Sequence, residues 1–149
     1  MSKIKIAHRG YSINEKDNSI KSFEKAIYNN FDMIELDIQL CKNDKIIVFH
    51  DLFLNNKLVK DLTYEEIIKI DKDIITLEQF FNIEDINKIK IYLDIKGTGN
   101  IIKKLHQFIK NNKINCKNLY IASFNYIHVL QLNMLNFEES KIGFTPLNI

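Results

Sequence analysis

The sequence is poor in glycine, proline, cysteine and arginine. Its 149 residues include four glycines, one proline, two cysteines and a single arginine, Arg9. So little glycine and proline excludes a collagen-like chain, and a 46% apolar share with 27% charged residues excludes a wholly disordered one. The length suits a single domain that buries about two thirds of its unfolded surface. We therefore expect one domain over residues 1–149.

The cysteines and the hydropathy pattern exclude further classes of protein. Cys41 and Cys116 are far apart, and neither they nor the four histidines have the spacing of a zinc site or a redox motif. Two reduced thiols in a cytoplasmic protein are the simplest interpretation. No apolar run approaches the roughly 18 residues of a membrane helix, and residues 1–6 do not resemble a secretion signal.

The basic residues are almost all lysine. Twenty lysines and Arg9 stand against 19 acidic residues, and the net charge of +2 provides no basic surface for nucleic acid. We therefore expect no nucleic-acid partner. Arg9 stands out because the planar arginine fork binds phosphate in a bidentate way that lysine does not reproduce.

Strands and helices are predicted to alternate along the chain without a linker. Apolar runs and period-two patterns predict strands over residues 3–8, 33–40, 46–50, 90–96, 118–124 and 141–145. Capping residues and helical spacing predict a helix that begins after Ser19 or Asn18 and others over 64–70, 77–83, 101–109 and 126–135. The tight link at 42–45 favours an antiparallel or locally extended pair of strands. The rest of the pattern predicts an α/β fold with a mostly parallel sheet.

Polar side chains follow or interrupt four of the predicted strands, at the ends where parallel sheets bind ligands. Glu35 and Asp37 are two residues apart and share one face of a strand, as do Asp94 and Lys96. Taken singly, each polar residue has a simpler interpretation as a helix cap, a solvated turn residue or the exposed face of an edge strand. The whole group consists of His8, Arg9, Glu35, Asp37, His50, Asp94 and Lys96.

The chemistry of this group is complementary. Three carboxylates are the ligands that a hard divalent cation such as Mg²⁺ or Ca²⁺ prefers. Two histidines can supply a general acid and a general base, and Arg9 can hold a phosphate. The residues together predict a metal-assisted phosphoryl-transfer site.

The same residues form motifs that resemble those of the glycerophosphodiester phosphodiesterase family. The matching segments are 7–10, 34–40 followed by 48–51, and 92–96, in the family's order and spacing. The resemblance implies a TIM-barrel-like fold and hydrolysis of glycerophosphodiesters to an alcohol and glycerol 3-phosphate. In this family the glycerol 2-hydroxyl is thought to attack phosphorus, which gives a cyclic phosphate that water then opens.

The resemblance also implies a role for each residue of the group. His8 and His50 would be the acid/base pair, while Arg9 would bind the substrate phosphate with help from Lys96. The ligands of the divalent cation would be Glu35, Asp37 and Asp94.

The chain departs from the family pattern at one site residue and in length. Asp94 stands where the family usually has glutamate, which is one methylene longer. A full barrel takes about 250 residues, so the chain corresponds to about six of its eight strands, a truncated barrel. Three explanations are open. The reading frame is incomplete, or another chain, such as a second copy in a homo-oligomer, covers the open edge of the sheet. In the third, the chain is a reduced fold that covers its sheet edges in an unfamiliar way.

Two other functions remain open from the sequence. The first is a catalytically inactive partial barrel that binds a phosphodiester or a protein partner. The second is a related phospholipase D-like lyase, which would use a similar histidine pair and metal on choline phospholipids. The sequence offers no obvious exposed apolar loop for binding such a lipid substrate at a membrane.

Overall fold

The computed structural model describes residues 3–137 and 139–145. The strands are β1 (Ile6–His8), β2 (Met33–Leu40), β3 (Ile46–Val48), β4 (Phe53–Leu54), β5 (Lys57–Leu58), β6 (Ile75–Thr76), β7 (Lys90–Ile95), β8 (Leu119–Ser123) and β9 (Lys141–Phe144). The helices are α1 (Ile20–Tyr28), α2 (Tyr64–Ile70), α3 (Leu77–Phe81), α4 (Ile101–Asn111) and α5 (Tyr126–Met134). Short 3₁₀ turns lie at η1 (Val59–Asp61), η2 (Ile86–Lys88) and η3 (Cys116–Asn118).

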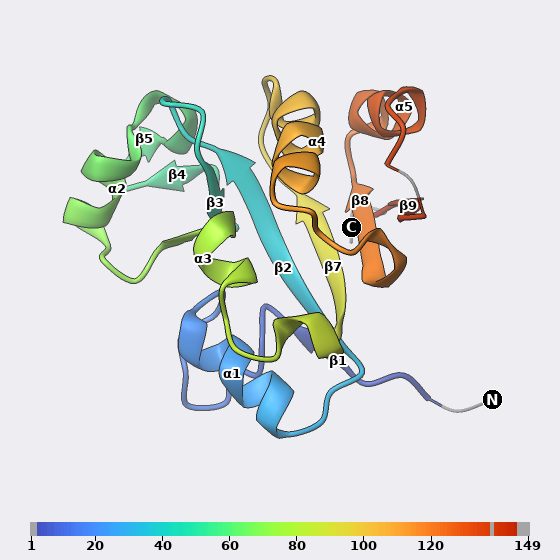
Figure 1. The fold of residues 1–149 in the computed structure, drawn as a ribbon. Coiled ribbons are helices and arrows are strands. Elements are labelled where there is room, and N and C mark those ends of the chain that lie inside the picture. Colours follow the sequence, from blue (N-terminus) through green and yellow to red (C-terminus); the bar gives the residue numbers. More distant parts are fainter. Residues whose placement is uncertain (1–2, 138, 146–149) are drawn as a thin grey trace.

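β2 lies in the middle of the sheet (Figure 1). β1 pairs in parallel with its first residues, β3 pairs antiparallel with residues 38–40, and β7 pairs in parallel along its other side. β8 and β9 continue the sheet in parallel beyond β7, and β6 lies beyond β3. The tight turn between β2 and β3 therefore makes the antiparallel pair that the sequence favours.

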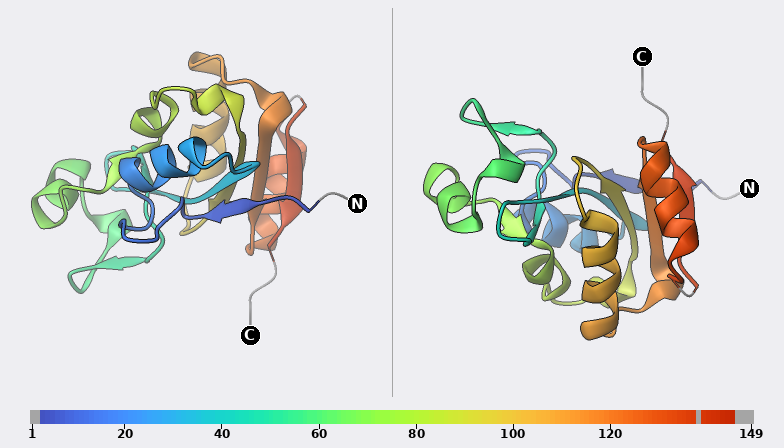
Figure 2. Two further views of the ribbon diagram at one scale, coloured as in Figure 1. Left: turned by 90° about the horizontal axis from the view of Figure 1, so that it is seen from below. Right: turned by 90° about the horizontal axis from the view of Figure 1, so that it is seen from above.

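The helices cover the apolar face of the sheet. Alternate residues of β2, such as Ile34, Leu36 and Ile38, pack in one core cluster with side chains of α1, α3, α4 and α5. Phe23 of α1 meets Phe80 of α3 edge to face, with ring centroids 4.8 Å apart. A smaller cluster joins α2 to the other face of β3. Figure 2 shows these helices around the strands from below and from above.

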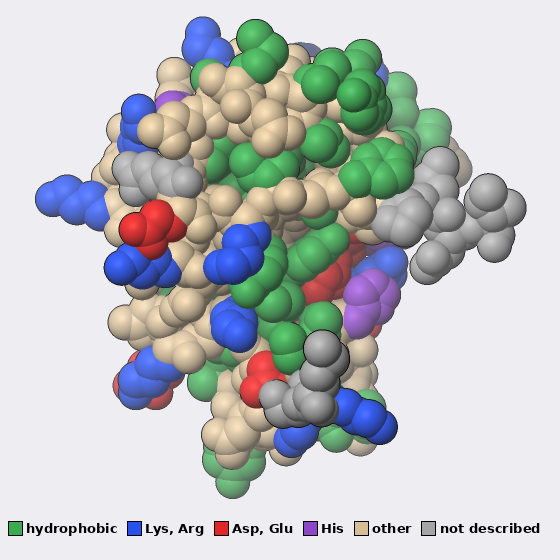
Figure 3. Space-filling view, turned by 90° about the vertical axis from the view of Figure 1, so that its right-hand side faces the viewer, with side chains coloured by type: hydrophobic (Ala, Val, Ile, Leu, Met, Phe, Trp, Pro, Cys, Tyr) green, Lys and Arg blue, Asp and Glu red, His purple; other side chains and the backbone are tan. Residues whose placement is uncertain are grey.

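The opposite face of the sheet carries the polar side chains of β2 and β7 and is not enclosed by a complete barrel. In the part of the chain that the structure describes, β9 pairs only with β8, so the sheet does not close. Figure 3 views the molecule from the side of β8 and β9, and acidic and histidine side chains appear beside apolar ones toward the right of that view. The α/β fold with an open, barrel-like parallel sheet agrees with the prediction.

Several predicted elements differ in extent. The first strand begins at Ile6 rather than residue 3, the third ends at Val48, and the helix predicted over 77–83 ends at Phe81. The sequence also did not predict the β4–β5 hairpin. The alternative that Glu35 and Asp37 form the exposed face of an edge strand is wrong, because β2 is central and buried throughout.

The structure also bears on membrane-spanning helices and on the two cysteines. Among the described residues, no helix is both long and apolar enough to cross a lipid bilayer. Cys41 and Cys116 are free and buried, and they belong to different clusters of the core.

Candidate active site

Three buried carboxylates converge on the polar face of the sheet. Glu35, Asp37 and Asp94 each offer an oxygen, and these oxygens all lie within 4.8 Å of one another. Asp37 and Asp94 are direct partners in the pairing of β2 with β7, and Glu35 shares their face because it lies two residues before Asp37. We call these three residues the acidic triad. The period-two spacing in the sequence therefore predicted the triad correctly as a spatial cluster.

Burial strongly perturbs Glu35. Desolvation is the main cause that raises its pKa to about 8, and the negative charge of Asp37 adds to it. The backbone N–H of Arg9 opposes this rise by donating a hydrogen bond of 2.9 Å to Glu35 Oε2. Glu35 therefore keeps a proton at neutral pH unless a positive charge enters the triad.

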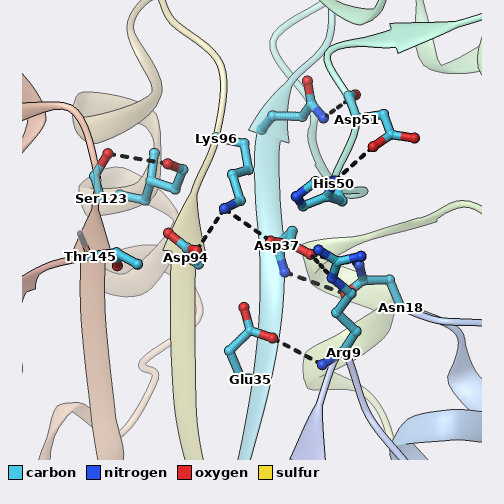
Figure 4. Close-up of polar contacts among 12 residues, drawn as sticks. Arg9, Asn18, Glu35, Asp37, His50, Asp51, Asp94, Lys96, Ser123 and Thr145 are labelled. Carbon is cyan, nitrogen blue, oxygen red and sulfur yellow. Dashed lines mark hydrogen bonds and ion pairs between the residues drawn. The ribbon is translucent and has the colours of Figure 1, made fainter. Parts of the chain in front are cut away.

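Lys96 neutralises the other two carboxylates (Figure 4). Its Nζ atom donates a hydrogen bond of 2.7 Å to Asp94 Oδ2 and lies 3.4 Å from Asp37 Oδ1. Burial opposes the charge on Lys96, but the hydrogen bond to Asp94 and the charges of both aspartates outweigh it and raise the pKa of Lys96. The ammonium group is therefore held firmly in its charged form.

The backbone after β1 adopts a strained conformation that orients Arg9. Arg9 has a φ of 57°, in the left-handed region that non-glycine residues rarely adopt. Its carbonyl oxygen accepts hydrogen bonds from the N–H of Asn18 and the hydroxyl of Ser22. Gly10 follows with a φ of 81°, and a Cβ there would overlap Ser22. The His-Arg-Gly sequence thus fits a turn in which glycine is needed at the third position.

The side chain of Arg9 reaches back to the triad. Its Nε atom lies 3.1 Å from Asp37 Oδ2, and its guanidinium is 3.5 Å from Asp17 Oδ2. Asn18 holds the same Asp37 oxygen with a hydrogen bond of 3.0 Å from its Nδ2 atom. Asp37 is therefore held by three side chains, those of Arg9, Asn18 and Lys96.

The two histidines lie at the edge of this buried network. His8 ends β1 with its Nε2 atom 3.8 Å from Glu35 Oε2, and 70% of its side chain is exposed. His50 lies beyond β3, and its Nδ1 atom is 2.7 Å from Asp51 Oδ1. Because a carboxylate only accepts hydrogen bonds, Asp51 favours the tautomer with a proton on Nδ1, which leaves Nε2 for proton exchange.

His50 belongs to the same cleft as the other site residues. It lines a hollow of about 170 Å³ together with Arg9, and a second hollow of about 570 Å³ together with Lys96. The structure thus brings all seven predicted site residues together, from the middle of β2 and from the carboxyl ends of β1, β3 and β7.

Two positioning residues were not included in the predicted site. Asn18 fixes Asp37, and Gln39 Nε2 donates hydrogen bonds of 2.8 and 2.9 Å to the carbonyl oxygens of Phe49 and Asp51, on either side of His50. Gln39 continues the period-two series of Glu35 and Asp37 on β2, which was the available sequence signal. Asn18 gave only a weak signal because its loop position does not indicate the direction of its side chain.

The acidic triad fits a hard divalent cation. Asp94 Oδ1 is buried and has no hydrogen-bond partner among the described residues, although a buried carboxylate oxygen normally has one. An oxygen-ligated cation would satisfy this atom and favour the charged form of Glu35. The three carboxylates are the residues that would hold it.

Comparison with known proteins identifies several glycerophosphodiester phosphodiesterases among the relatives. A curated glycerophosphodiester phosphodiesterase of Bacillus altitudinis is 45% identical over 76 residues, which are 48% of this chain and 31% of the relative. A solved glycerophosphodiester phosphodiesterase of Parabacteroides distasonis superimposes with a TM-score of 0.83 at 24% identity, covering 95% of this chain and 64% of the other. An Oleispira antarctica phosphodiesterase in complex with the product sn-glycerol-3-phosphate gives a TM-score of 0.79 at 20% identity, covering 95% and 64%.

The chain is short relative to these proteins. It spans about a third of the Bacillus relative and somewhat less than two thirds of the two solved structures. Within that span, residues 8–146 match the model of the glycerophosphoryl diester phosphodiesterase family. The match covers nearly the whole chain and includes every residue of the candidate site, so this chain belongs to the glycerophosphoryl diester phosphodiesterase family.

Proposed function

We propose that the chain is a metal-dependent phosphodiesterase that hydrolyses glycerophosphodiesters to an alcohol and glycerol 3-phosphate. The observation that carries this proposal is the acidic triad, three buried carboxylates with an unpartnered oxygen on Asp94, beside two accessible histidines. Family membership and a relative of that activity at 45% identity support it further. A protein of the same fold binds glycerol 3-phosphate.

In this proposal the triad holds Mg²⁺ or Ca²⁺, and the cation would stabilise negative charge on the phosphoryl oxygens. Arg9 and Lys96 bind the phosphate of the substrate. For this role Arg9 shares its guanidinium between the phosphate and the aspartates that it contacts in the structure. With the divalent cation counted, three carboxylates and two positive side chains would give the site a net charge of about +1, which suits a phosphodiester that carries one negative charge.

His8 and His50 exchange protons in the two stages of the reaction. In the first stage one histidine takes the proton of the glycerol 2-hydroxyl as its oxygen bonds to phosphorus. The other histidine gives a proton to the departing alcohol oxygen as its bond to phosphorus breaks. In the second stage water opens the cyclic phosphate, and the two histidines act in reverse. The positions of His8 and His50 at the accessible rim are consistent with either assignment of acid and base.

The proposal is tested by release of glycerol 3-phosphate from glycerophosphocholine. We expect turnover with Mg²⁺ or Ca²⁺, loss with EDTA, and recovery when the cation is restored. His8→Ala and His50→Ala should each lose at least about a hundredfold in kcat, the usual contribution of acid/base catalysis. His106→Ala is the matched control, because His106 lies on α4 and bonds the carbonyl oxygen of Asn136. A folded protein without turnover in any cation contradicts the proposal.

Two alternatives are separated by the same assay. The open sheet favours a partial barrel that only binds a phosphodiester, in which case glycerol 3-phosphate would bind without turnover of any substrate. A lyase would stop at the cyclic phosphate, which ³¹P NMR distinguishes from glycerol 3-phosphate. We propose hydrolysis because both histidines and all three carboxylates are present and correctly grouped.

Assembly and location remain predictions. A second copy that pairs with the open edge of β9 would cover its unpaired backbone groups, and light scattering of the purified chain would measure such a dimer. A cytoplasmic location is proposed from the two free cysteines, both of which are buried.

A further inference from the structure

A second, apolar hollow adjoins the candidate active site. Its volume is about 570 Å³, and it lies between the segment after His50 and the start of the loop after β7. His50, Asp51 and Lys96 contribute its polar edge, where the Asp51 carboxylate is paired with His50 Nδ1 at 2.7 Å. The rest of the wall is largely formed by Leu52, Phe53 and Phe124. We call this hollow the apolar cleft.

The walls of the apolar cleft are held in place by the fold. The N–H of Val59, a fully buried residue, donates a hydrogen bond of 2.9 Å to the carbonyl oxygen of Leu52. Gln39 fixes the backbone on both sides of His50. Nevertheless, 58% of Phe53 and 45% of Leu52 are exposed. Neighbouring exposed apolar side chains that line a hollow beside a charged site are typical of a ligand-binding surface.

The smaller hollow on the other side of His50 has a different character. It is lined by charged side chains, including Lys16, Asp17 and Asp73. A carbon chain would leave these charges without water, whereas it would replace water at apolar surface in the apolar cleft. The two sides of His50 therefore favour different chemical groups of a substrate.

Charge further limits the occupant of the apolar cleft. The Nζ atom of Lys96 lies 5.9 Å from the ring centroid of Phe124, so that ring already faces a cation. A quaternary ammonium group in the cleft would meet the like charge of Lys96, while the carboxylate of Asp51 at the cleft edge is already paired with His50. An uncharged carbon chain is not repelled by Lys96.

We infer that the apolar cleft binds the alcohol moiety of the substrate and selects glycerophosphodiesters whose alcohol is an uncharged carbon chain. The inference rests on the proposed function, because the cleft shares His50 and Lys96 with the proposed phosphate site. The phosphate lies between Arg9 and Lys96, and the alcohol extends past His50 towards Phe53.

The test compares two glycerophosphodiesters in the same cation, the octyl ester and glycerophosphocholine. The octyl ester is kept below its micelle concentration, so that the comparison reports the cleft and not a lipid surface. We expect kcat/KM to be at least about tenfold higher for the octyl ester, since burial of only a few methylenes gives such a factor. Equal or reversed values would overturn the inference and leave the proposed function intact.

A substitution in the apolar cleft tests whether the cleft causes the preference for the octyl ester. Phe53→Ser should reduce the ratio of the two kcat/KM values by about tenfold, mainly through the octyl ester. Tyr28→Ser is the matched control, because Tyr28 is an aromatic residue with 85% exposure on α1 and lies outside the cleft. An equal effect of both variants on the ratio would contradict the assignment. Circular dichroism checks that both variants are folded.

A binding measurement covers the case in which neither ester is cleaved. That outcome contradicts the proposed function, and titration calorimetry then compares octyl phosphate with methyl phosphate. Tighter binding of octyl phosphate by at least about tenfold, weakened by Phe53→Ser, would still support the apolar cleft. Equal affinities would overturn it.

Discussion

Asp37 and Asp94 lie directly opposite each other in the β2–β7 pairing, and the ammonium group of Lys96 lies between their carboxylates. Two like charges on neighbouring buried strands repel each other strongly at low dielectric. Lys96 offsets that repulsion within the sheet itself. The same arrangement provides a divalent cation with two preformed carboxylate ligands. The cation and Lys96 would then both offset the negative charge of the two aspartates.

The first prediction concerns Lys96. Lys96→Met leaves two buried aspartates with less compensation, so we expect the metal-free protein to lose about 2 kcal/mol of unfolding free energy. Lys45→Met is the control, because the Lys45–Glu65 pair, 3.5 Å apart, is exposed to solvent and contributes little to stability. Urea denaturation measures both values. Equal losses would show that Lys96 is not needed to balance the aspartates.

The second prediction concerns Asn18, which positions Asp37. Asn18 has a φ of 56°, so Asn18→Gly keeps the backbone conformation and removes only the amide that bonds Asp37. We expect the Mg²⁺ concentration for half-maximal activity to rise by about tenfold or more, as for other residues that orient metal ligands. Asn30→Gly, at an exposed residue with a φ of 53°, should leave that concentration unchanged.

The third prediction separates backbone strain from steric overlap at glycine. Gly10 and Gly99 have φ values of 81° and 88°, but only at Gly10 would a Cβ meet other atoms, those of Ser22. Gly99→Ala should cost about 1 kcal/mol of unfolding free energy from backbone strain alone. Gly10→Ala should cost at least about 2 kcal/mol more, because Ser22 must move. Thermal denaturation of both variants checks the order.

The fourth prediction concerns a buried histidine outside the site. Ser123 Oγ donates to the carbonyl oxygen of Ile95 and accepts from the N–H of Asn125, so His128 Nδ1 must donate the remaining bond of 3.0 Å. Burial lowers the pKa of His128 below its usual 6.5. The unfolded chain therefore takes up the proton first as the pH falls below 6.5, and the folded state loses stability there.

That loss is measured as the difference between wild type and His128→Asn in the change of unfolding free energy between about pH 7.5 and about pH 5, at most about 1.4 kcal/mol per pH unit. The comparison is needed because Glu35, whose pKa is raised to about 8, contributes with the opposite sign in both proteins. His128→Asn keeps a donor near Ser123 but does not titrate, so acidification should destabilise the wild type relative to the variant. An identical change in both proteins would contradict a role for His128.

The sequence predicted most of the fold because local signals agreed with the tertiary structure. Thr63 with Glu66 and Thr76 with Gln79 form the predicted capping boxes, and each begins its helix at the expected residue. The β4–β5 hairpin was missed although Asn55 and Asn56 have the positive φ values of a two-residue turn. Strands of two residues are too short to give a period-two pattern.

The candidate site was predictable where its residues share a strand. Glu35 and Asp37 follow from the alternation of β2, whereas the contact between His8 and Glu35 depends on the register of β1 against β2. That register is set by packing of the whole sheet and cannot be predicted from the sequence of either strand alone. The apolar cleft was also missed. In the sequence Leu52 and Phe53 resemble core residues, and only the structure shows that both are exposed.

The central position of β2 also constrains the order in which the chain acquires its structure during synthesis. β2 leaves the ribosome with Glu35 and Asp37 on one face, and His8, Arg9 and Asn18 precede them as partners. Lys96, which completes the balance of charge, follows β7. Burial of β2 before that point would leave its charges poorly compensated. We therefore expect β2 to become buried as it pairs with β7, once Lys96 is present to balance the charges of both strands.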